Sequence, residues 1–266
     1  QKFTVIPTAR KISHSKKYLL LDITNYNQLK NIIEQYNPDV IINCIAFTDV
    51  DKAEEQKKTA YDINVNTVKN IVKASSKDSK ILHISSDYVF DGKKDNYIET
   101  DSTFPVNYYG RTKLEAENIL IGSNRDVLIF RLNVLFDGNK QKNNFFSWVC
   151  SALLNKEKIN VAIDQISNPV YIPDFIDILI DSILLNYSGL YHYGSLNPIS
   201  RYEFAINISK LLEIETDLIN PVSTNSLKQI AKRPSNSFLN CDKIKSDFNI
   251  DLFSNKYNIQ RAILNR

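Results

Sequence analysis

The sequence predicts an α/β protein with a doubly wound parallel sheet and a smaller C-terminal lobe. Three observations predict this class. Short apolar runs alternate with helical segments through the first half of the chain, as they do in parallel β-α-β units. After Asp137 the alternation loosens and helical segments dominate. The length of 266 residues suits one large domain with an added lobe.

In the first half, strands and helices are expected to alternate. The expected strands are Tyr18–Asp22, Val40–Ala46, Lys80–Ser86 and Val127–Arg131. The expected helices are one capped by Thr24 or Asn25 that ends at Gln35, one over Ala60–Ser75, and one that carries Tyr109.

The second half is expected to be mainly helical. The expected helices are Phe145–Asn155, Pro173–Asn186, Arg201–Leu212 and Lys256–Leu264, with short apolar segments such as Leu190–Tyr193 between them. We therefore expect residues 1–138 to form the sheet domain and residues 139–266 to form mainly the lobe. Within the second part, the segment from about 175 to 195 is expected to return to the sheet domain.

The composition excludes several classes of partner. The net charge of +3 is small and dispersed, so no nucleic-acid partner is expected. No run is long and apolar enough to span a membrane. Cys44, Cys150 and Cys241 are odd in number and share no short spacing, which is typical of reduced, mostly buried thiols in a cytoplasmic protein.

The histidines give no sign of a metal centre. His14, His83 and His192 have no ligand spacing, and His83 lies within an apolar run. We therefore expect no catalytic metal, and we expect His83 to be packed inside its strand.

The chemistry suggested by the sequence is protonation of an alkoxide. Ser85 and Ser86 end an apolar strand, and ligands collect at that edge of a parallel sheet. Tyr109 precedes Lys113 by four residues, which places a phenol and an ammonium on one helix face. A close cation and the charge of a bound cofactor together favour a phenolate, so we expect the pKa of Tyr109 to lie below its usual value of about 10. Such a Tyr can protonate a carbonyl oxygen while hydride reaches its carbon.

The spacing of Tyr109 and Lys113 is weak evidence without its context. The pair Tyr26 and Lys30 has the same spacing, but no strand that ends in a hydroxyl residue precedes it. We interpret this second pair as part of a solvated helix face.

Several motifs together resemble dTDP-4-dehydrorhamnose reductases, which are RmlD-like members of the extended short-chain dehydrogenase/reductase superfamily. The segments that carry the resemblance are Asn43–Glu54 (NCIAFTDVDKAE), Ile84–Gly92 (ISSDYVFDG), Asn107–Lys113 (NYYGRTK) and Lys232–Ser237 (KRPSNS). They span nearly the whole chain in the order of the family, so their combination is far more specific than any one of them.

The resemblance implies a Rossmann-like fold, a C-terminal substrate-binding lobe and a function in deoxysugar biosynthesis. The reaction would be the NADPH-dependent reduction of the C4 keto group of a nucleotide-activated 4-keto-6-deoxy sugar. Tyr109 would supply the proton, Lys113 would tune Tyr109 and position the nicotinamide ribose, and Ser86 would orient the carbonyl. A homodimer is compatible with this class of protein.

The resemblance also implies which residues contact the cofactor. Besides Tyr109 and Lys113, these would be Thr8, Arg10, Asp22, Ile23, Ala46, Phe47 and Asn64. Arg10 lies where NAD-selective folds often carry an acidic ribose ligand, so NADPH is preferred and NADH is the alternative. A solvated basic turn at Arg10 and a capping role for Asp22 are the competing interpretations. Asn64 would brace the strand that leads to Phe47.

The substrate contacts follow in the same way. They would come from Thr48, Val50, Asp51, Ser86, Asp87, Val134, Arg233 and Asn236. Arg233 would contact an anionic group such as the pyrophosphate of the nucleotide sugar, with a salt bridge between the lobes as the alternative. Val134 stands where the family often has Trp, which leaves the choice of 4-keto sugar open. The chain's one Trp, Trp148, is expected to lie on a helix with its side chain in the core of the protein.

One family feature is missing from the sequence. A dinucleotide-binding fold has a glycine-rich turn after its first strand, whereas the first glycine here is Gly92. The opening segment Phe3–Pro7 matches the second strand of the family. We therefore expect that the first strand, its glycine loop and the first helix are missing, either by N-terminal incompleteness or as a real feature.

Two alternatives keep the fold but change the function. One is a non-catalytic, dinucleotide-binding regulatory subunit that resembles the β-subunit of methionine adenosyltransferase. The other is a nucleotide-sugar epimerase or dehydratase, because those reactions use the same Tyr and Lys. Consumption of free NADPH would favour the reductase, whereas tight retention of NAD would favour an epimerase or dehydratase.

Overall fold

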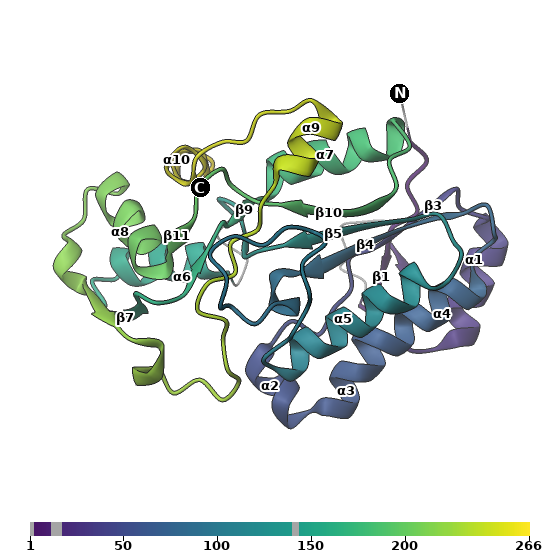
Figure 1. Ribbon diagram of the computed structural model, residues 1–266, viewed down its shortest axis with the longest axis horizontal. Helices are drawn as coiled ribbons and strands as arrows, with labels where there is room; N and C mark the ends of the chain where they lie inside the picture. Colours follow the sequence, from purple (N-terminus) through teal and green to yellow (C-terminus); the bar gives the residue numbers. More distant parts are fainter. Residues whose placement is uncertain (1–2, 12–17, 140–143) are drawn as a thin grey trace.

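The central sheet consists of four parallel strands in the spatial order β10, β5, β4, β3 (Figure 1). The computed structural model describes residues 3–11, 18–139 and 144–266. The strands are β3 (Val40–Asn43), β4 (Lys80–Ser86), β5 (Val127–Leu132) and β10 (Gly189–Tyr193). Their apolar runs are buried because helices cover both faces of the sheet.

Helices α1, α4 and α5 cover one face of this sheet, and α7 and α9 cover the other (Figure 1). Their bounds are α1 (Tyr26–Tyr36), α4 (Thr67–Ala74), α5 (Tyr108–Ile121), α7 (Ile172–Leu184) and α9 (Asp242–Phe248). Successive residues of β4 serve the two faces, since Ile81 packs with the first group and Leu82 with the second. The α/β class with a parallel sheet is therefore confirmed.

The N-terminal strands are shorter than the sequence predicts. β1 (Thr8–Ala9) and β2 (Leu19–Leu20) pair with each other in parallel. Residues 3–7 form no strand, and Pro7, which has no N–H, contributes only a carbonyl that accepts from the N–H of Leu19. Among the described residues β3 is an edge of the central sheet, and its Ile42 is 42% exposed. The missing first strand stays a prediction.

The helix expected over Ala60–Ser75 is interrupted. The chain instead forms α2 (Val50–Glu55), α3 (Lys57–Tyr61), a π-helical turn at Asp62–Asn66 and then α4. Such π-helical turns are rare inside helices and are frequent at functional sites. Here the turn carries Asn64, which is buried.

Helix α1 follows the sequence prediction more closely. Asn25 caps α1 by accepting from the backbone N–H groups of Asn27 and Gln28. Lys30 is exposed and pairs with Glu34, so this turn of α1 is a solvated face.

The C-terminal lobe has a core of its own, built mainly from α6, α8 and α10 (Figure 1). Its helices are α6 (Phe145–Leu154), α8 (Arg201–Leu211) and α10 (Asn255–Leu264). Its short strands are β6 (Leu135–Phe136), β7 (Ile159–Ala162), β8 (Ile166–Ser167), β9 (Val170–Tyr171), β11 (Ile199–Ser200) and β12 (Ile219–Val222). The lobe is placed at the end of the sheet where β4 and β5 finish (Figure 1).

The prediction that Trp148 lies in the core is wrong, because its side chain is 45% exposed. The buried residues of α6 are Phe146, Val149, Cys150, Ala152 and Leu153, and the large side chains among them are at positions 146, 149 and 153. This spacing defines one helical stripe, and Trp148 lies off it. Cys150 and Cys241 are buried, whereas Cys44 is exposed.

The described residues include no helix that is both long and apolar enough to cross a membrane. They also include no group of three or more His, Cys, Asp or Glu side chains arranged to hold a metal ion. His14 lies outside the described residues.

Gly110 lets the first turn of α5 lie directly against the carbonyl of Tyr88. A methyl group at this position would lie 2.1 Å from the Tyr88 oxygen and 3.0 Å from Cβ of Pro105. Gly110→Ala should therefore push α5 away from the end of β4 and lower the free energy of unfolding by about 1–3 kcal/mol. Urea unfolding measures this change.

Gly122→Ala is the matched control, because Gly122 follows the same helix with φ −78° and its added methyl group would meet nothing closer than 3.2 Å. Its effect should stay within about 1 kcal/mol. Equal losses in the two variants would contradict the close contact at Gly110.

Candidate active site

Polar side chains gather where β3, β4, β5 and β10 end. In register, Asn43 on β3 lies beside His83 on β4. Two residues further along, Ser85 on β4 lies beside Arg131 on β5, which in turn lies beside His192 on β10. Because side chains alternate between the faces of a sheet, His83 and Ser85 point to the same side, toward α5. Two rows of polar side chains therefore lie beneath α5: Asn43 with His83, and Ser85 with Arg131 and His192.

Ser86 and Asp87 form a buried hydroxyl–carboxylate pair at the end of β4. The Ser86 hydroxyl donates to Oδ1 of Asp87 at 2.9 Å, and the Ser237 hydroxyl donates to Oδ2 at 2.6 Å. Burial raises the pKa of the Asp87 carboxyl to about 6, although the hydrogen bonds from Ser237 and Ser86 oppose this rise. Ser237 comes from the C-terminal segment, so this contact joins the two halves of the chain.

Tyr109 lies at the start of α5, close to Ser86. Asn107 caps the helix by accepting from the N–H of Gly110 at 2.8 Å, and its amide donates to the carbonyl of Lys232. The Tyr109 ring meets the Tyr88 ring edge-on at 5.9 Å. Burial raises the pKa of Tyr109 and the Asp87 charge raises it further, whereas a hydrogen bond with Ser86 opposes the rise. The groups of the chain itself therefore raise this pKa, whereas the expected lowering also depends on the charge of a bound cofactor.

The reason lies in the direction of Lys113. Its Nζ lies 2.6 Å from the carbonyl oxygen of Ile84, to which it donates, and 3.3 Å from Nε2 of His83. The side chain therefore runs to β4 rather than along the helix to the phenol. Burial lowers the pKa of Lys113 to about 8, while the charges of Glu117 and Cys44 act in the opposite direction.

Glu117 and Arg131 form a buried ion pair behind Ser85. Arg131 donates from Nε to the Glu117 carboxylate at 3.0 Å and from Nη2 at 2.7 Å, and the Ser85 hydroxyl donates to the same carboxylate. Arg131 also approaches Nε2 of His192 at 3.4 Å. Ser85 therefore supports the strand end, while its neighbour Ser86 faces the phenol.

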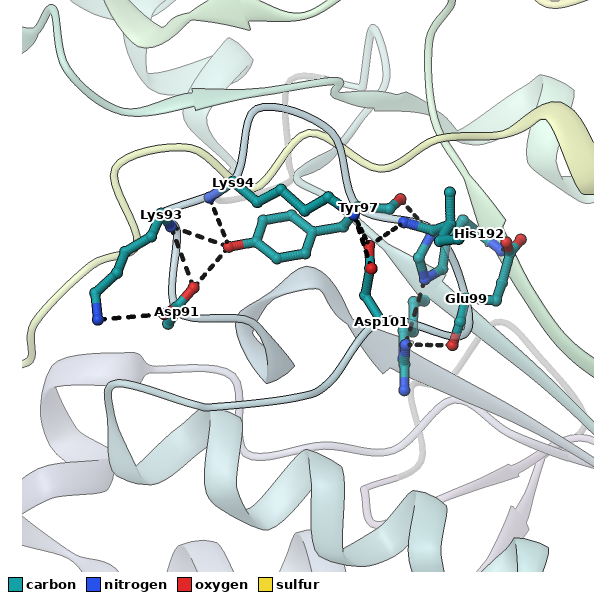
Figure 2. A network of polar contacts seen from close by, with 9 residues as sticks. Asp91, Lys93, Lys94, Tyr97, Glu99, Asp101 and His192 are labelled. Carbon is teal, nitrogen blue, oxygen red and sulfur yellow. Dashed lines mark hydrogen bonds and ion pairs between the residues drawn. The ribbon is translucent and has the colours of Figure 1, made fainter.

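The loop after β4 is tied to this pair through His192. Figure 2 shows Tyr97 at its centre: the Tyr97 hydroxyl donates to Asp91 and accepts from the N–H groups of Lys93 and Lys94. Nδ1 of His192 lies 3.1 Å from the carbonyl of Tyr97, and the N–H of His192 donates to Glu99 (Figure 2). Burial lowers the pKa of His192 to about 3, so this ring is neutral and Nδ1 donates.

Asn64 holds the loop that follows β3. Its Oδ1 accepts from the N–H of Phe47 at 2.7 Å, and its Nδ2 donates to Oγ1 of Thr112 at 2.8 Å. The π-helical turn thereby fixes Ala46 and Phe47 relative to α5. Asn64 braces the loop after the strand, because β3 ends at Asn43.

Arg10 lines a cavity of about 640 Å³ beyond the end of β1. Thr24, Asp62, Asn66 and Lys69 also line it. The Asp22 carboxylate is held in place, because its Oδ1 accepts from both the N–H and the hydroxyl of Thr24. These two hydrogen bonds lower the pKa of Asp22. Ile23 packs against the α1 side of the core.

Asp51 and Arg233 come together as a pair. Nη1 of Arg233 lies 3.1 Å from Oδ1 of Asp51, which also accepts from the N–H of Ala231. The sequence analysis offers two partners for Arg233, an anionic ligand or a salt bridge between the lobes. The contact with Asp51 is a salt bridge between the two halves of the chain. Among the other expected substrate residues, Thr48 is exposed, whereas Val50, Val134 and Asn236 are half-buried.

Arg201 is a site residue that sequence reasoning missed. It lies in the first turn of α8, donates to Tyr88 and stacks over Phe145 at 4.6 Å. Its charge also acts on Asp87. The capping box of Ser200 and Glu203 marks the start of α8 in the sequence, but it gives no sign that Arg201 reaches the end of β4.

The comparisons with known proteins agree with this architecture. The profile of the family described as RmlD substrate binding domain matches residues 1–266. The chain belongs to this family. A dTDP-4-dehydrorhamnose reductase of Aggregatibacter actinomycetemcomitans is 37% identical to this RmlD-family protein over 244 residues, which are 86% of this chain and 82% of that protein. The family identified from the motifs is therefore confirmed.

Two further relatives bear on the function. The solved structure of a dTDP-4-dehydrorhamnose reductase from Bacillus anthracis, in complex with NADP, has a TM-score of 0.87 at 30% identity and covers 92% of this chain and 87% of that one. The methionine adenosyltransferase 2 subunit beta of Pongo abelii is 28% identical over 250 residues, which are 86% of this chain and 71% of that protein.

The buried amine of Lys113 should reduce the stability of the fold near neutral pH. Its pKa is about 8 in the folded protein and 10.5 ordinarily, so the unfolded chain binds more protons between these values and stability rises with pH there. Lys113→Met should therefore stabilise the protein at pH 7. This advantage should shrink by about 2 kcal/mol between roughly pH 8 and 9.5.

Denaturant unfolding at a series of pH values tests this. Lys58→Met, at an exposed lysine on α3, should leave the pH dependence unchanged. The same pH dependence in both variants would mean that the burial of Lys113 does not act on its charge.

Proposed function

We propose that this protein reduces the C4 keto group of a nucleotide-activated 4-keto-6-deoxy sugar with NADPH, as a dTDP-4-dehydrorhamnose reductase. The observation that carries the proposal is the contact between Ser86 and Tyr109 at the carboxyl end of a parallel sheet, with buried Lys113 one helical turn further on. Ligands bind at this edge in open α/β sheets. The relatives named dTDP-4-dehydrorhamnose reductase support the reaction.

The phenol of Tyr109 is suited to act as the acid. It holds its proton at neutral pH and can donate it to a carbonyl oxygen as that oxygen gains charge. The Ser86 hydroxyl, which donates to Asp87 in this structure, would turn its proton to the substrate carbonyl and orient it. Bound NADPH supplies the hydride.

We assign the proposed cofactor contacts from where the residues lie in the fold. Arg10 and Lys69 place two cations on one cavity, a donor set that fits the adenosine end of a dinucleotide with a 2′-phosphate. The NADP complex of the Bacillus anthracis relative supports this choice. Thr8, Asp22 and Ile23 would complete the adenosine end, while Ala46 and Phe47 would run beneath the nicotinamide ribose that Lys113 positions.

The substrate would lie between the end of β4 and the C-terminal lobe. Arg233, 9% exposed and paired with Asp51, can exchange this carboxylate for the phosphate of a nucleotide sugar. The remaining proposed contacts are Thr48, Val50, Asp87, Val134 and Asn236. The division of the chain at residue 138 also stays a proposal.

A dinucleotide-binding subunit without turnover is the second candidate. The similarity to methionine adenosyltransferase 2 subunit beta favours it. This candidate predicts cofactor binding without consumption of NADPH in the presence of the 4-keto sugar nucleotide.

Tyr109→Phe should lower kcat by about 10²–10⁴-fold, because it removes the proton donor and leaves the ring. Its dissociation constant for NADPH should stay close to that of the wild type. Oxidation of NADPH measures the rate, and fluorescence titration measures the affinity.

Tyr108→Phe removes the neighbouring phenol and should leave kcat nearly unchanged. Near-normal turnover by Tyr109→Phe would remove Tyr109 from the chemistry. Binding of NADPH by the wild type without turnover would favour the second candidate.

Arg10→Ala should weaken NADPH more than NADH, by about tenfold or more, because a charge-assisted hydrogen bond contributes about 1.5–3 kcal/mol. Titration of both cofactors measures the ratio. Lys11→Ala changes the adjacent exposed cation and serves as the control. An equal loss for both cofactors would separate Arg10 from the 2′-phosphate.

A further inference from the structure

Tyr88 contacts both members of the proposed hydroxyl–phenol pair. Its N–H donates to Oγ of Ser86 at 3.2 Å, and its ring meets the Tyr109 ring edge-on, with 5.9 Å between the ring centroids and 78° between the ring planes. The Tyr88 carbonyl lies against Gly110, so the backbone of Tyr88 is fixed between the end of β4 and the first turn of α5. The direction of the Tyr88 ring therefore bears directly on where the phenol of Tyr109 lies.

Arg201, from the C-terminal lobe, holds the far end of this ring. Its guanidinium donates to the Tyr88 hydroxyl and stacks over the ring of Phe145 at 4.6 Å. The N–H of Arg201 donates to the carbonyl of Gln165 at 3.0 Å, which fixes the residue at the start of α8. A planar guanidinium stacked on an aromatic ring presents its N–H groups in a fixed direction. Tyr88 is thus held at its backbone by the sheet domain and at its hydroxyl by the lobe.

The stability of the fold does not explain a cation at this position. Arg201 is the first residue of α8, where the helix dipole favours an anion. Among the described residues it forms no ion pair with a carboxylate, whereas Arg233 pairs with Asp51. Burial lowers the pKa of Arg201 and the charge of Arg233 adds to this, while Tyr88 and Asp87 act in the opposite direction. A charge kept where stability disfavours it indicates a functional role.

We propose that Arg201 is a positioning residue for the proton donor Tyr109 and acts through the hydroxyl and the ring of Tyr88. The hydrogen bond from Arg201 fixes the direction of the Tyr88 ring. The edge-on contact then carries this direction to Tyr109, whose hydroxyl lies at Ser86. Such a contact depends on the angle of the rings, because the positive edge of one must meet the negative face of the other.

This arrangement makes the alignment of the acid depend on the lobe. Tyr109 belongs to α5 in the sheet domain, whereas Arg201 belongs to α8 in the lobe. If the lobe moved away from the end of β4, the Tyr88 hydroxyl would lose the one hydrogen bond that it makes among the described residues. The phenol of Tyr109 is therefore aligned only while the two parts of the chain are packed together.

The first test is a double-variant cycle that follows oxidation of NADPH with the 4-keto sugar nucleotide. Tyr88→Phe removes only the hydroxyl, and Arg201→Met removes the guanidinium but keeps a long side chain. Each should lower kcat by about tenfold, because small misplacements of a catalytic group have large effects on rate, while KM for the sugar nucleotide should stay within about twofold. The double variant should lose no more than either single variant, because both changes remove the same hydrogen bond.

Arg111→Met is the matched control, because Arg111 follows Tyr109 directly and is exposed. It should keep the kcat of the wild type. Losses that multiply in the double variant, or a normal kcat in Arg201→Met, would overturn the proposal. A raised KM with an unchanged kcat would overturn it too, since Arg201 and Tyr88 would then act on substrate binding and not on the acid.

The second test needs no turnover. The ¹³Cζ signal of Tyr109 reports the ring beside it through the ring-current shift, and Tyr109→Phe assigns this signal among the 14 tyrosines. Arg201→Met should shift the signal, Tyr88→Phe should shift it in the same direction, and Arg111→Met should leave it in place. An unshifted signal in either of the first two variants would contradict the role of Arg201. Tyr88→Phe conserves the shape of the ring, so it gives this readout even where Arg201→Met fails to fold.

The proposal rests on the reductase function, because it takes Tyr109 as the acid, and the two tests separate their failures. Absence of turnover in the wild type would count against the reductase function and leave the ¹³C test of Arg201 valid. An unshifted Tyr109 signal beside normal wild-type turnover would remove Arg201 from the positioning of the acid and leave the reductase function intact.

Discussion

Arg131 on β5 and Glu117 on α5 are both removed from water, and such charges are tolerated only when each satisfies the other. This pair, with Ser85 on the same carboxylate, locks α5 against the ends of two strands. Loss of either partner of a buried pair costs about 3–5 kcal/mol, because the other charge is left uncompensated. Tyr109 and Lys113 lie on this helix, so their positions depend on the pair. The loop after β4 depends on it too, through His192.

The sequence predicts the parts of this site that depend on local signals. An apolar run that ends in two serines identifies β4, and the motif Tyr109–Lys113 identifies the start of α5. Asn25 as a helix cap is local in the same sense. The resemblance then places these elements in a family, which the comparison confirms. The roles of individual residues in cofactor and substrate binding stay predictions.

The remaining features depend on which strands lie side by side. His83 is expected to be packed, and nothing near it in the sequence indicates Asn43 or Lys113 as its partners. Arg201 reaches Tyr88 across more than a hundred residues. The spacing of Tyr109 and Lys113 gives the helix face but not the direction of the Lys113 side chain, which runs to the carbonyl of Ile84. Trp148 is misplaced because hydrophobic character alone does not assign a residue to the buried stripe of α6.

The motif Tyr109–Lys113 combines four constrained positions with one open position. Gly110 lies against the carbonyl of Tyr88, and the Thr112 hydroxyl accepts from Asn64 while it donates to the carbonyl of Tyr109. Arg111 alone among the five is exposed. Neutral drift in this segment should therefore concentrate at position 111. A library that randomised all five positions would return functional members that differ there and almost nowhere else.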